Sequence, residues 1–316
     1  MYIERDTIDD LLHALLTELL NRPFDNKPTK GINSEIFGVL LKLNNPRARL
    51  SRTETRGKPF SALGELFWYL SEDNKLDFIQ YYIKKYDDSS DDGITVHGGY
   101  GPRLYRMHGK YNQIEKVIDL LSTNSYSRKA VIQLFDASDL EKKYKDIPCT
   151  CTLQFVVRKN KLHMFSTMRS NDVFLGLPHD IFCFTMIQEI VARSLGIDLG
   201  PYSHAVGSMH LYKRHKERAI KYLGEGFQDT STCMPEMPKK SPWESIKTIR
   251  QIEERIRLNE EFDFSEYNLD EYWIDISYLL LSYSLFKRNK KKSVEKIIDN
   301  LTHPVYKSYI NEKLQM

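Results

Sequence analysis

Cys149 is the residue whose type and surroundings most directly suggest covalent chemistry. It follows Pro148 in the segment KDIPCTCTLQF, where a loop leads into a run of residues typical of a strand. A thiol at the start of a strand is accessible to a small molecule, and it becomes a nucleophile where neighbouring cations lower its pKa. The alternative is a small apolar core residue, which is the commoner role of a free cysteine.

Polar residues also gather between a predicted strand and a predicted helix. The segment MRSND places Arg169, Ser170 and Asp172 there. A guanidinium and a hydroxyl at such a turn are suited to holding a phosphate. The alternative is a structural ion pair between Arg169 and Asp172. Further on, His210 and Tyr212 are two residues apart and therefore share one face of a predicted strand.

The sequence gives no indication of a metal site. His210 and His215 have no further ligand at metal-binding spacing, and none of the four cysteines belongs to a CxxC pair. The net charge of +3 is too small to indicate a nucleic-acid partner. The basic run KRNKKKS (287–293) is interpreted as a solvated turn between helices, with a polyanion contact as the alternative. No signal peptide or membrane-spanning run is recognisable, so we expect a cytoplasmic protein.

Hydrophobic periodicity predicts an α+β body followed by helices. Helices are predicted at 7–21 (with Asp6 as N-cap), 60–70, 78–86, 113–121, 178–195 and 213–222, and strands at 35–43, 129–135, 150–158, 161–168 and 202–212. The acidic, glycine-rich segment 87–101 is predicted to be a loop. Later helices are expected at 242–259, 269–287, 293–301 and 304–314. We therefore predict a catalytic domain at 1–225, a linker at 226–243 and a helical C-terminal extension at 244–316.

Six separated motifs occur in an order that identifies a family. They are ELFWYL at 65–70, YG at 100–101, SR at 127–128, PC at 148–149, MRSNDVFLGLP at 168–178 and GSMHLY at 207–212. From 35 to 215 the chain resembles the thymidylate synthase family, and within it the deoxycytidylate or CMP hydroxymethylase branch. The resemblance implies a mixed sheet with surrounding helices, and a homodimer.

The resemblance also implies a mechanism and its residues. Cys149 would attack carbon 6 of a pyrimidine, Glu65 would be the general acid and base, and 5,10-methylenetetrahydrofolate would supply the carbon. Asp172 and Gly176 correspond to cofactor-binding positions. The implied ligands of a nucleoside monophosphate are Arg169, Ser170, Tyr100, His210, Tyr212 and, from the neighbouring subunit, Arg128 and Lys129. A further phosphate ligand is expected from Lys27 or Lys30.

Asp180 is the residue that favours cytosine over uracil. The resemblance places it where thymidylate synthases have an asparagine that reads uracil. Cytosine presents an acceptor at ring nitrogen 3 and a donor at position 4, which suits a protonated carboxyl group. The alternative is an acidic residue favoured at a helix N-terminus.

Hydroxymethylation is favoured over methylation by two departures from the synthases. Thr150 stands where they usually have histidine, and the segment 86–100 contains no tryptophan. Thymidylate synthesis, deoxycytidylate methylation and a nucleotide- or RNA-binding protein without turnover remain alternatives. The sequence leaves open whether the sugar is ribose or deoxyribose, and which pathway uses the product.

Overall fold

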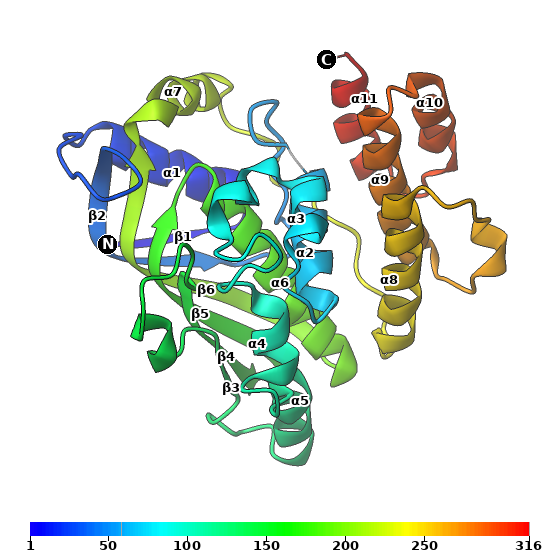
Figure 1. Ribbon diagram of the computed structural model, residues 1–316, viewed down its shortest axis with the longest axis horizontal. Coiled ribbons are helices and arrows are strands. Elements are labelled where there is room, and N and C mark those ends of the chain that lie inside the picture. Colours follow the sequence, from blue (N-terminus) through cyan, green and yellow to red (C-terminus); the bar gives the residue numbers. More distant parts are fainter. Residues whose placement is uncertain (58, 316) are drawn as a thin grey trace.

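The body of the molecule is built on one mixed sheet. The computed structural model describes residues 1–57 and 59–315, and the strands found there form a six-stranded sheet in the order β1-β2-β6-β5-β4-β3 (Figure 1). The strands are β1 (Tyr2–Arg5), β2 (Asn33–Leu43), β3 (Val131–Gln133), β4 (Thr150–Arg158), β5 (Lys161–Asp172) and β6 (Asp198–Tyr212). β1 pairs with β2 and β5 with β6 in parallel, whereas the other pairs are antiparallel. The predicted α+β class is confirmed.

The sheet brings the chemical motifs to one end. β4 and β5 form the predicted hairpin, whose turn residues Lys159 and Asn160 both have positive φ, as a two-residue hairpin turn requires. At the far end of this hairpin Thr150 pairs with Met168. β6 runs beside β5, so Asp172 is paired with His210. The residues that follow Pro148, Met168 and Ser208 therefore converge.

Helices pack on the sheet and on one another. Those of the body are α1 (Ile8–Leu20), α2 (Pro59–Leu70), α3 (Leu76–Tyr82), α4 (Tyr100–Arg106), α5 (Gln113–Thr123), α6 (Gly176–Ser194) and α7 (Lys216–Gly224). α6 packs on β5 and β6, and α2 packs on α6. Gly64 permits the close approach of α2 to α3, because a Cβ atom there would lie 2.0 Å from the ring of Tyr82.

The C-terminal helices stand beside α2 and α3 (Figure 1). They are α8 (Trp243–Leu258), α9 (Glu271–Lys287), α10 (Lys291–Asn300) and α11 (Lys307–Gln315). α8 and α9 pack on α2. Asp275 of α9 is fully buried and accepts hydrogen bonds from the backbone of Thr302 and His303, which ties α9 to the chain after α10. Of the helices described, none has the length and apolar character to span a membrane.

The segment between α7 and α8 has neither helix nor strand in its described residues, yet it is attached to the body. Met234 and Met237 are buried, and the Arg193 guanidinium donates to Glu236 over 2.6 Å. Beyond it, the basic run 287–293 lies at the exposed turn between α9 and α10.

Several local predictions were wrong. Thr7, not Asp6, is the N-cap of α1, because its hydroxyl accepts from the Asp10 amide. The short strand β1 and the helix α4 were missed, since a four-residue edge strand and a glycine-flanked helix give weak periodicity. The third helix ends at Tyr82 and is followed by a 3-10 helix (Lys84–Ser89).

Candidate active site

Cys149 immediately precedes β4 and is partly buried. Burial raises the pKa of its thiol, and the nearby charge of Arg169 opposes that effect. Asp146 and Asp180 raise the same pKa further, whereas Lys30 lowers it. The thiol therefore lies within electrostatic reach of two cations and two carboxyl groups, and additional positive or hydrogen-bonding groups would be needed to make it a thiolate at neutral pH.

Arg169 is exposed and folds back over the chain that carries the thiol. Its Nε donates to the carbonyl of Pro148 over 3.0 Å, its Nη2 donates to that of Ile147 over 3.2 Å, and its backbone amide donates to Cys149 over 2.9 Å. Ser170 follows it, partly buried, on β5. Nothing in the described part of the chain pairs Arg169 with Asp172, so the structural ion pair considered above is absent there.

Asp172 organises the turn between β5 and α6. Its Oδ1 accepts from the amides of Phe174 and Leu175, over 2.8 and 3.3 Å. No hydrogen bond of Oδ2 occurs among the described residues. This second oxygen is therefore the one available to a donor on a ligand.

Glu65 lies on α2 and is 7% exposed. Its Oε1 accepts from the hydroxyls of Tyr69, over 2.7 Å, and Tyr86, over 3.2 Å. Burial raises the pKa of Glu65, and these two hydrogen bonds lower it. A carboxyl group whose pKa is raised in this way holds a proton more readily than an exposed glutamate, which suits a general acid and base.

Asp180 lies in the first turns of α6, and its pKa is raised to about 8. Burial is the main cause, and the charge of Glu65 adds to it. A hydrogen bond from the Asn171 amide to Asp180 Oδ2, 2.7 Å long, acts in the opposite direction. At pH 7 the side chain is mostly a neutral carboxylic acid. Gly176 faces this pair, since a Cβ atom there would lie 3.1 Å from Asn171 Nδ2.

Tyr100 is the first residue of α4, and its side chain contacts both α2 and β4. Its hydroxyl donates to Thr150 Oγ1 over 2.9 Å and accepts from the Thr150 amide over 3.2 Å. Its ring centroid is 4.9 Å from that of Tyr69. Burial raises the pKa of Tyr100, as do the charges of Asp180 and Cys149, so its hydroxyl remains protonated.

The end of β6 supplies His210 and Tyr212. Both are buried, and their ring centroids are 4.8 Å apart. Burial lowers the pKa of His210, which is therefore a neutral imidazole at pH 7. The guanidinium of Arg214 lies over the Tyr212 ring, 4.1 Å from its centroid. Cys149 contributes to the raised pKa of Tyr212, behind burial and Asp172.

The predicted cations divide into two groups. Lys27 and Lys30 are both exposed, but Lys30 lies 4.0 Å from Asp146, in the neighbourhood of Cys149. Arg128 and Lys129 are also exposed, in the loop before β3. Within the described residues, no side-chain hydrogen bond or ion pair connects these two residues to the Cys149 region.

Sequence reasoning missed Arg56, a second feature of this region. Its side chain is 7% exposed, and its Nε and Nη2 atoms have no hydrogen-bond partner among the described residues. Burial lowers its pKa to about 10, the charge of Arg218 adds to this effect, and Asp172 opposes it. The guanidinium lies over the ring of Phe174, 5.2 Å from its centroid, and a buried cation whose N–H groups lack acceptors suits an anionic ligand group.

Tyr69, Tyr86 and Asn171 were also missed as partners of the candidate acids. Tyr69 was detectable, because it is four residues after Glu65 and so lies on the same face of α2. Tyr86 and Asn171 meet their partners only through the tertiary fold.

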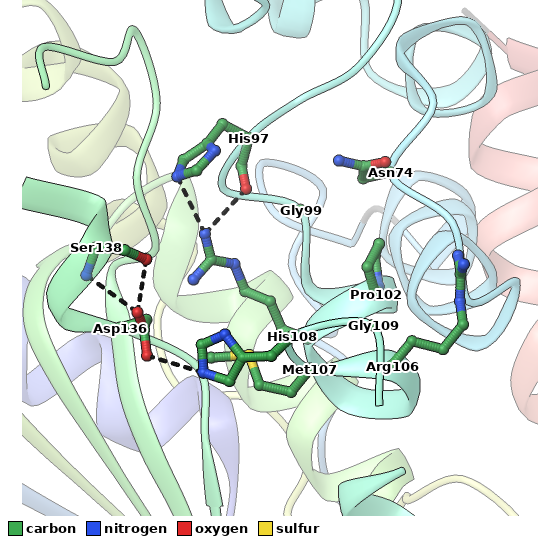
Figure 2. Close-up of a pocket in the computed structure, with 11 residues that line it drawn as sticks. Asn74, His97, Gly99, Pro102, Arg106, Met107, His108, Gly109, Asp136 and Ser138 are labelled. Atoms are coloured by element: carbon green, nitrogen blue, oxygen red, sulfur yellow. Dashed lines mark hydrogen bonds and ion pairs between the residues drawn. The ribbon is translucent and has the colours of Figure 1, made fainter. Parts of the chain in front are cut away.

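A separate pocket of about 280 Å³ lies between α4 and the loops next to it (Figure 2). None of the predicted site residues lines this pocket. Its Arg103 donates to buried Asp139 over 2.6 and 2.8 Å, and His97 Nε2 is 2.7 Å from the same carboxylate. These charges satisfy one another, so we interpret this arrangement as structural.

Comparison with known proteins agrees with this fold. The family profile described as thymidylate synthase matches residues 15–272. The chain therefore belongs to the thymidylate synthase family. The match extends beyond the predicted limits of 35 and 215 at both ends, and it includes α8.

Two phage proteins are similar to this chain, and both are named deoxyuridylate hydroxymethyltransferase. The one from Delftia phage PhiW-14 is 30% identical over 207 residues, which are 61% of this chain and 57% of the relative. The one from Pseudomonas phage M6 is 31% identical over 213 residues, 66% of this chain and 60% of the relative. The chain thus spans less than two thirds of the length of either relative.

Proposed function

We propose that this protein transfers a hydroxymethyl group to carbon 5 of a pyrimidine nucleoside 5′-monophosphate, with folate as the carbon source and cytosine as the base. Family membership and the two phage hydroxymethyltransferases support the reaction class. The observation that carries the choice of base is the pKa of about 8 at Asp180.

In this proposal Cys149 forms and breaks the covalent bond. Its sulfur adds to carbon 6, the electron pair of the 5,6 double bond moves to carbon 5, and the thiolate leaves when that double bond re-forms. The raised thiol pKa of the free protein requires activation by the substrate complex. Arg169 supports this role, because its charge favours the thiolate and its exposed guanidinium is available to a phosphate.

Glu65 exchanges protons at the base. Tyr69 and Tyr86 hold its Oε1, which leaves Oε2 for water or substrate. Its raised pKa allows it to be protonated in one step and ionised in another. His210 and Tyr212, adjacent at the end of β6, serve as hydrogen-bonding groups for the sugar.

The residues near Asp172 fit a folate. Asp172 Oδ2, which has no hydrogen bond among the described residues, suits a ring N–H group, and the unbonded Nε and Nη2 atoms that Arg56 has in that part of the chain suit a carboxylate-bearing tail. Because Gly176 has no side chain, no side-chain atom projects from it toward Asn171 and Asp172. When bound, 5,10-methylenetetrahydrofolate would supply a one-carbon unit at the oxidation level of formaldehyde.

Asp180 distinguishes the bases by its protonation state. A neutral carboxyl group donates to ring nitrogen 3 of cytosine and accepts from its 4-amino group. Deoxyuridylate is the second candidate substrate, because both phage relatives carry it in their names. Uracil presents a donor at ring nitrogen 3, which a protonated Asp180 oxygen would oppose.

A homodimer is part of the proposal. Large apolar side chains lie exposed on the sheet, including Phe37 at 85%, Tyr2 at 57% and Phe165 at 36%. If a second copy of the chain packed against the part of the sheet that carries these side chains, they would be buried. A partner subunit would also give a role to the exposed Arg128 and Lys129 as phosphate ligands.

The direct test is to incubate the protein with methylenetetrahydrofolate and with dCMP, CMP or dUMP, and to weigh the products by mass spectrometry. A hydroxymethyl group on a cytidine nucleotide is expected, and the preferred sugar follows from the same assay. Modification of dUMP alone would contradict the proposed base, and the absence of product from all three would contradict the activity.

Asp180→Asn tests the base-reading role. The amide presents a fixed donor and acceptor in place of a titratable acid, so we expect the preference for dCMP over dUMP to fall by about ten- to a hundredfold. The measurement is the ratio of kcat/KM for the two nucleotides. An unchanged ratio would remove Asp180 from base recognition.

A further inference from the structure

Behind Asp180 lies a buried hydrogen-bond chain, formed by Asn171, His204, Tyr202 and Ser166. Tyr202, Ser166 and His204 are fully buried and Asn171 is 4% exposed. His204 Nε2 lies 3.2 Å from Asn171 Oδ1, and its Nδ1 lies 2.7 Å from the Tyr202 hydroxyl and 2.9 Å from that of Ser166. The two hydroxyls are 2.7 Å apart.

The two hydroxyls determine which nitrogen of His204 carries the proton. If Nδ1 accepts, one hydroxyl donates to it and the other donates to the first, so both hydrogens are used. If Nδ1 carries a proton, one of the hydroxyl hydrogens has no acceptor among the described residues, and an unmade buried hydrogen bond is costly. Burial lowers the pKa of His204 to about 3, which excludes the doubly protonated ring near neutral pH. The single proton therefore resides on Nε2.

This tautomer fixes the amide of Asn171. Nε2–H donates to Asn171 Oδ1, so the NH₂ group must point to the other side, toward Asp180 Oδ2. An amide donor at Oδ2 disfavours a proton on that oxygen. The described residues contain no hydrogen-bond partner for Asp180 Oδ1, which is the oxygen left to carry the acidic proton.

We propose that the buried hydrogen-bond chain is a positioning device for base recognition, which confines the Asp180 proton to Oδ1 and thereby sets the donor that reads ring nitrogen 3 of the pyrimidine. Asn171 and His204 are positioning residues here, because they act through Asp180. This inference rests on the proposed base-reading function and extends its determinants from α6 to two strands of the sheet, β5 and β6.

Other ionisable groups near Asp180 define its electrostatic background. They are Glu65, Asp172, Cys149, Cys183, Tyr86, Tyr100 and Tyr202. Glu65 and Asp172 raise the pKa of Asp180, and Asn171 is the group that lowers it. Removing Asn171 should therefore shift the titration of Asp180 upward, whereas a general loosening of the pocket would admit water and shift it downward.

Asn171→Leu tests the chain, because leucine has a similar shape but neither donor nor acceptor. We expect the preference for dCMP over dUMP to fall about tenfold, the effect of one hydrogen bond. The pH above which dCMP binding weakens should increase. The matched control is Thr185→Val on α6, whose buried hydroxyl bonds only to its own helix. It should change neither quantity.

The tautomer argument has its own test, which leaves Asn171 and Asp180 in place. In Tyr202→Phe, Ser166 can still donate to Nδ1, so the base preference should be retained. The double variant Tyr202→Phe with Ser166→Ala removes both donors, frees the tautomer and should lose the preference. His204→Gln keeps one donor and one acceptor and should retain it, whereas His204→Leu should not.

These results distinguish a failure of the positioning role of the hydrogen-bond chain from a failure of base reading by Asp180. If Asp180→Asn changes the base preference while Asn171→Leu and the double variant keep the wild-type preference and pH dependence, the positioning role is wrong and base reading by Asp180 stands. If Asp180→Asn has no effect, the base-reading proposal itself fails. Thermal unfolding of each variant, with phosphate binding as a check, identifies any that do not fold.

Discussion

At the scale of single residues, the candidate site contains two carboxyl groups whose protonated form is favoured by burial. Asp180 and Glu65 both have raised pKa values, and each is held by hydrogen bonds to one of its two oxygens. Each therefore keeps one oxygen for a ligand. In both Asp180 and Glu65, one oxygen has a structural role and the other is available for binding or proton transfer.

The titration of Asp180 predicts a pH dependence of substrate binding. Its pKa of about 8 means that the donor form predominates below that pH and is lost above it. We expect the affinity for dCMP to be constant near neutrality and to fall as the pH rises through 8. The measurement is calorimetric binding to the Cys149→Ser variant, which removes the titration of the thiol. Adding Asp180→Asn should abolish the decline, and a decline that persists there would assign it to another group.

Cys149→Ser also tests the covalent step. A hydroxyl is a far weaker nucleophile than a thiolate, so turnover should fall by at least about a thousandfold. Nucleotide affinity should change little, because Arg169, His210 and Tyr212 remain. Turnover at the wild-type rate would contradict the covalent mechanism.

The sequence indicated most of these residues, but not how they are connected. Cys149 and Glu65 stand in motifs whose order identifies a family, and Asp180 lies two residues after the end of another. By contrast, the partners Asn171 and Tyr86 meet them across the fold, and Arg56 is notable only because it is buried with two nitrogens that have no hydrogen-bond partner in the described part of the chain. Such relationships arise from tertiary packing, which no local pattern encodes.

At the scale of elements, α2 determines where Glu65 lies. Eleven of its twelve residues are buried, so it contacts protein on nearly every side. The long strands and amphipathic helices were predictable because their periodicity is strong. The N-cap at Thr7, β1 and α4 were not, since each depends on a few residues whose structure is set by neighbours.

Gly64→Ala should disturb α2. The added methyl group would lie 2.0 Å from the ring of Tyr82, so the two helices must separate. Overpacking of this kind costs about 1–3 kcal/mol of unfolding free energy. Urea denaturation measures the loss, and kcat should fall because Glu65 moves. Gly224→Ala at the end of α7 is the control, since a Cβ atom there meets nothing within 4 Å.

At the scale of the whole molecule, the C-terminal helices share the core of the body. Trp273 and Tyr272 are buried in the same apolar cluster as α2 and α6, and the Tyr283 hydroxyl donates to the carbonyls of Tyr81 and Tyr82. The division into 1–225 and 244–316 stays a prediction about the organisation of the chain. The shared core leads us to expect one cooperative unit.

The variant Trp273→Ala distinguishes one cooperative folding unit from two independent domains. Loss of a fully packed indole costs about 3–5 kcal/mol. We expect a single calorimetric transition that shifts as a whole to lower temperature, together with loss of activity at the shifted temperature. Two transitions, of which only one moves, would indicate independent domains.

Removal of residues 243–316 tests the shared core in a second way. It should yield an unfolded or aggregated protein, and an active, soluble fragment would contradict the shared core.

The covering of α2 by α8 and α9 has a consequence for biosynthesis. The hydrogen bond between Tyr82 and Glu253 joins residues that are 171 positions apart. While the ribosome is still making the intervening chain, the apolar outer side of α2 and α3 has nothing to pack against. Nascent chains at this stage would be substrates for chaperones. The helix that carries Glu65 is among the earlier elements to be translated, yet it must wait for α8 and α9 before its native surroundings exist.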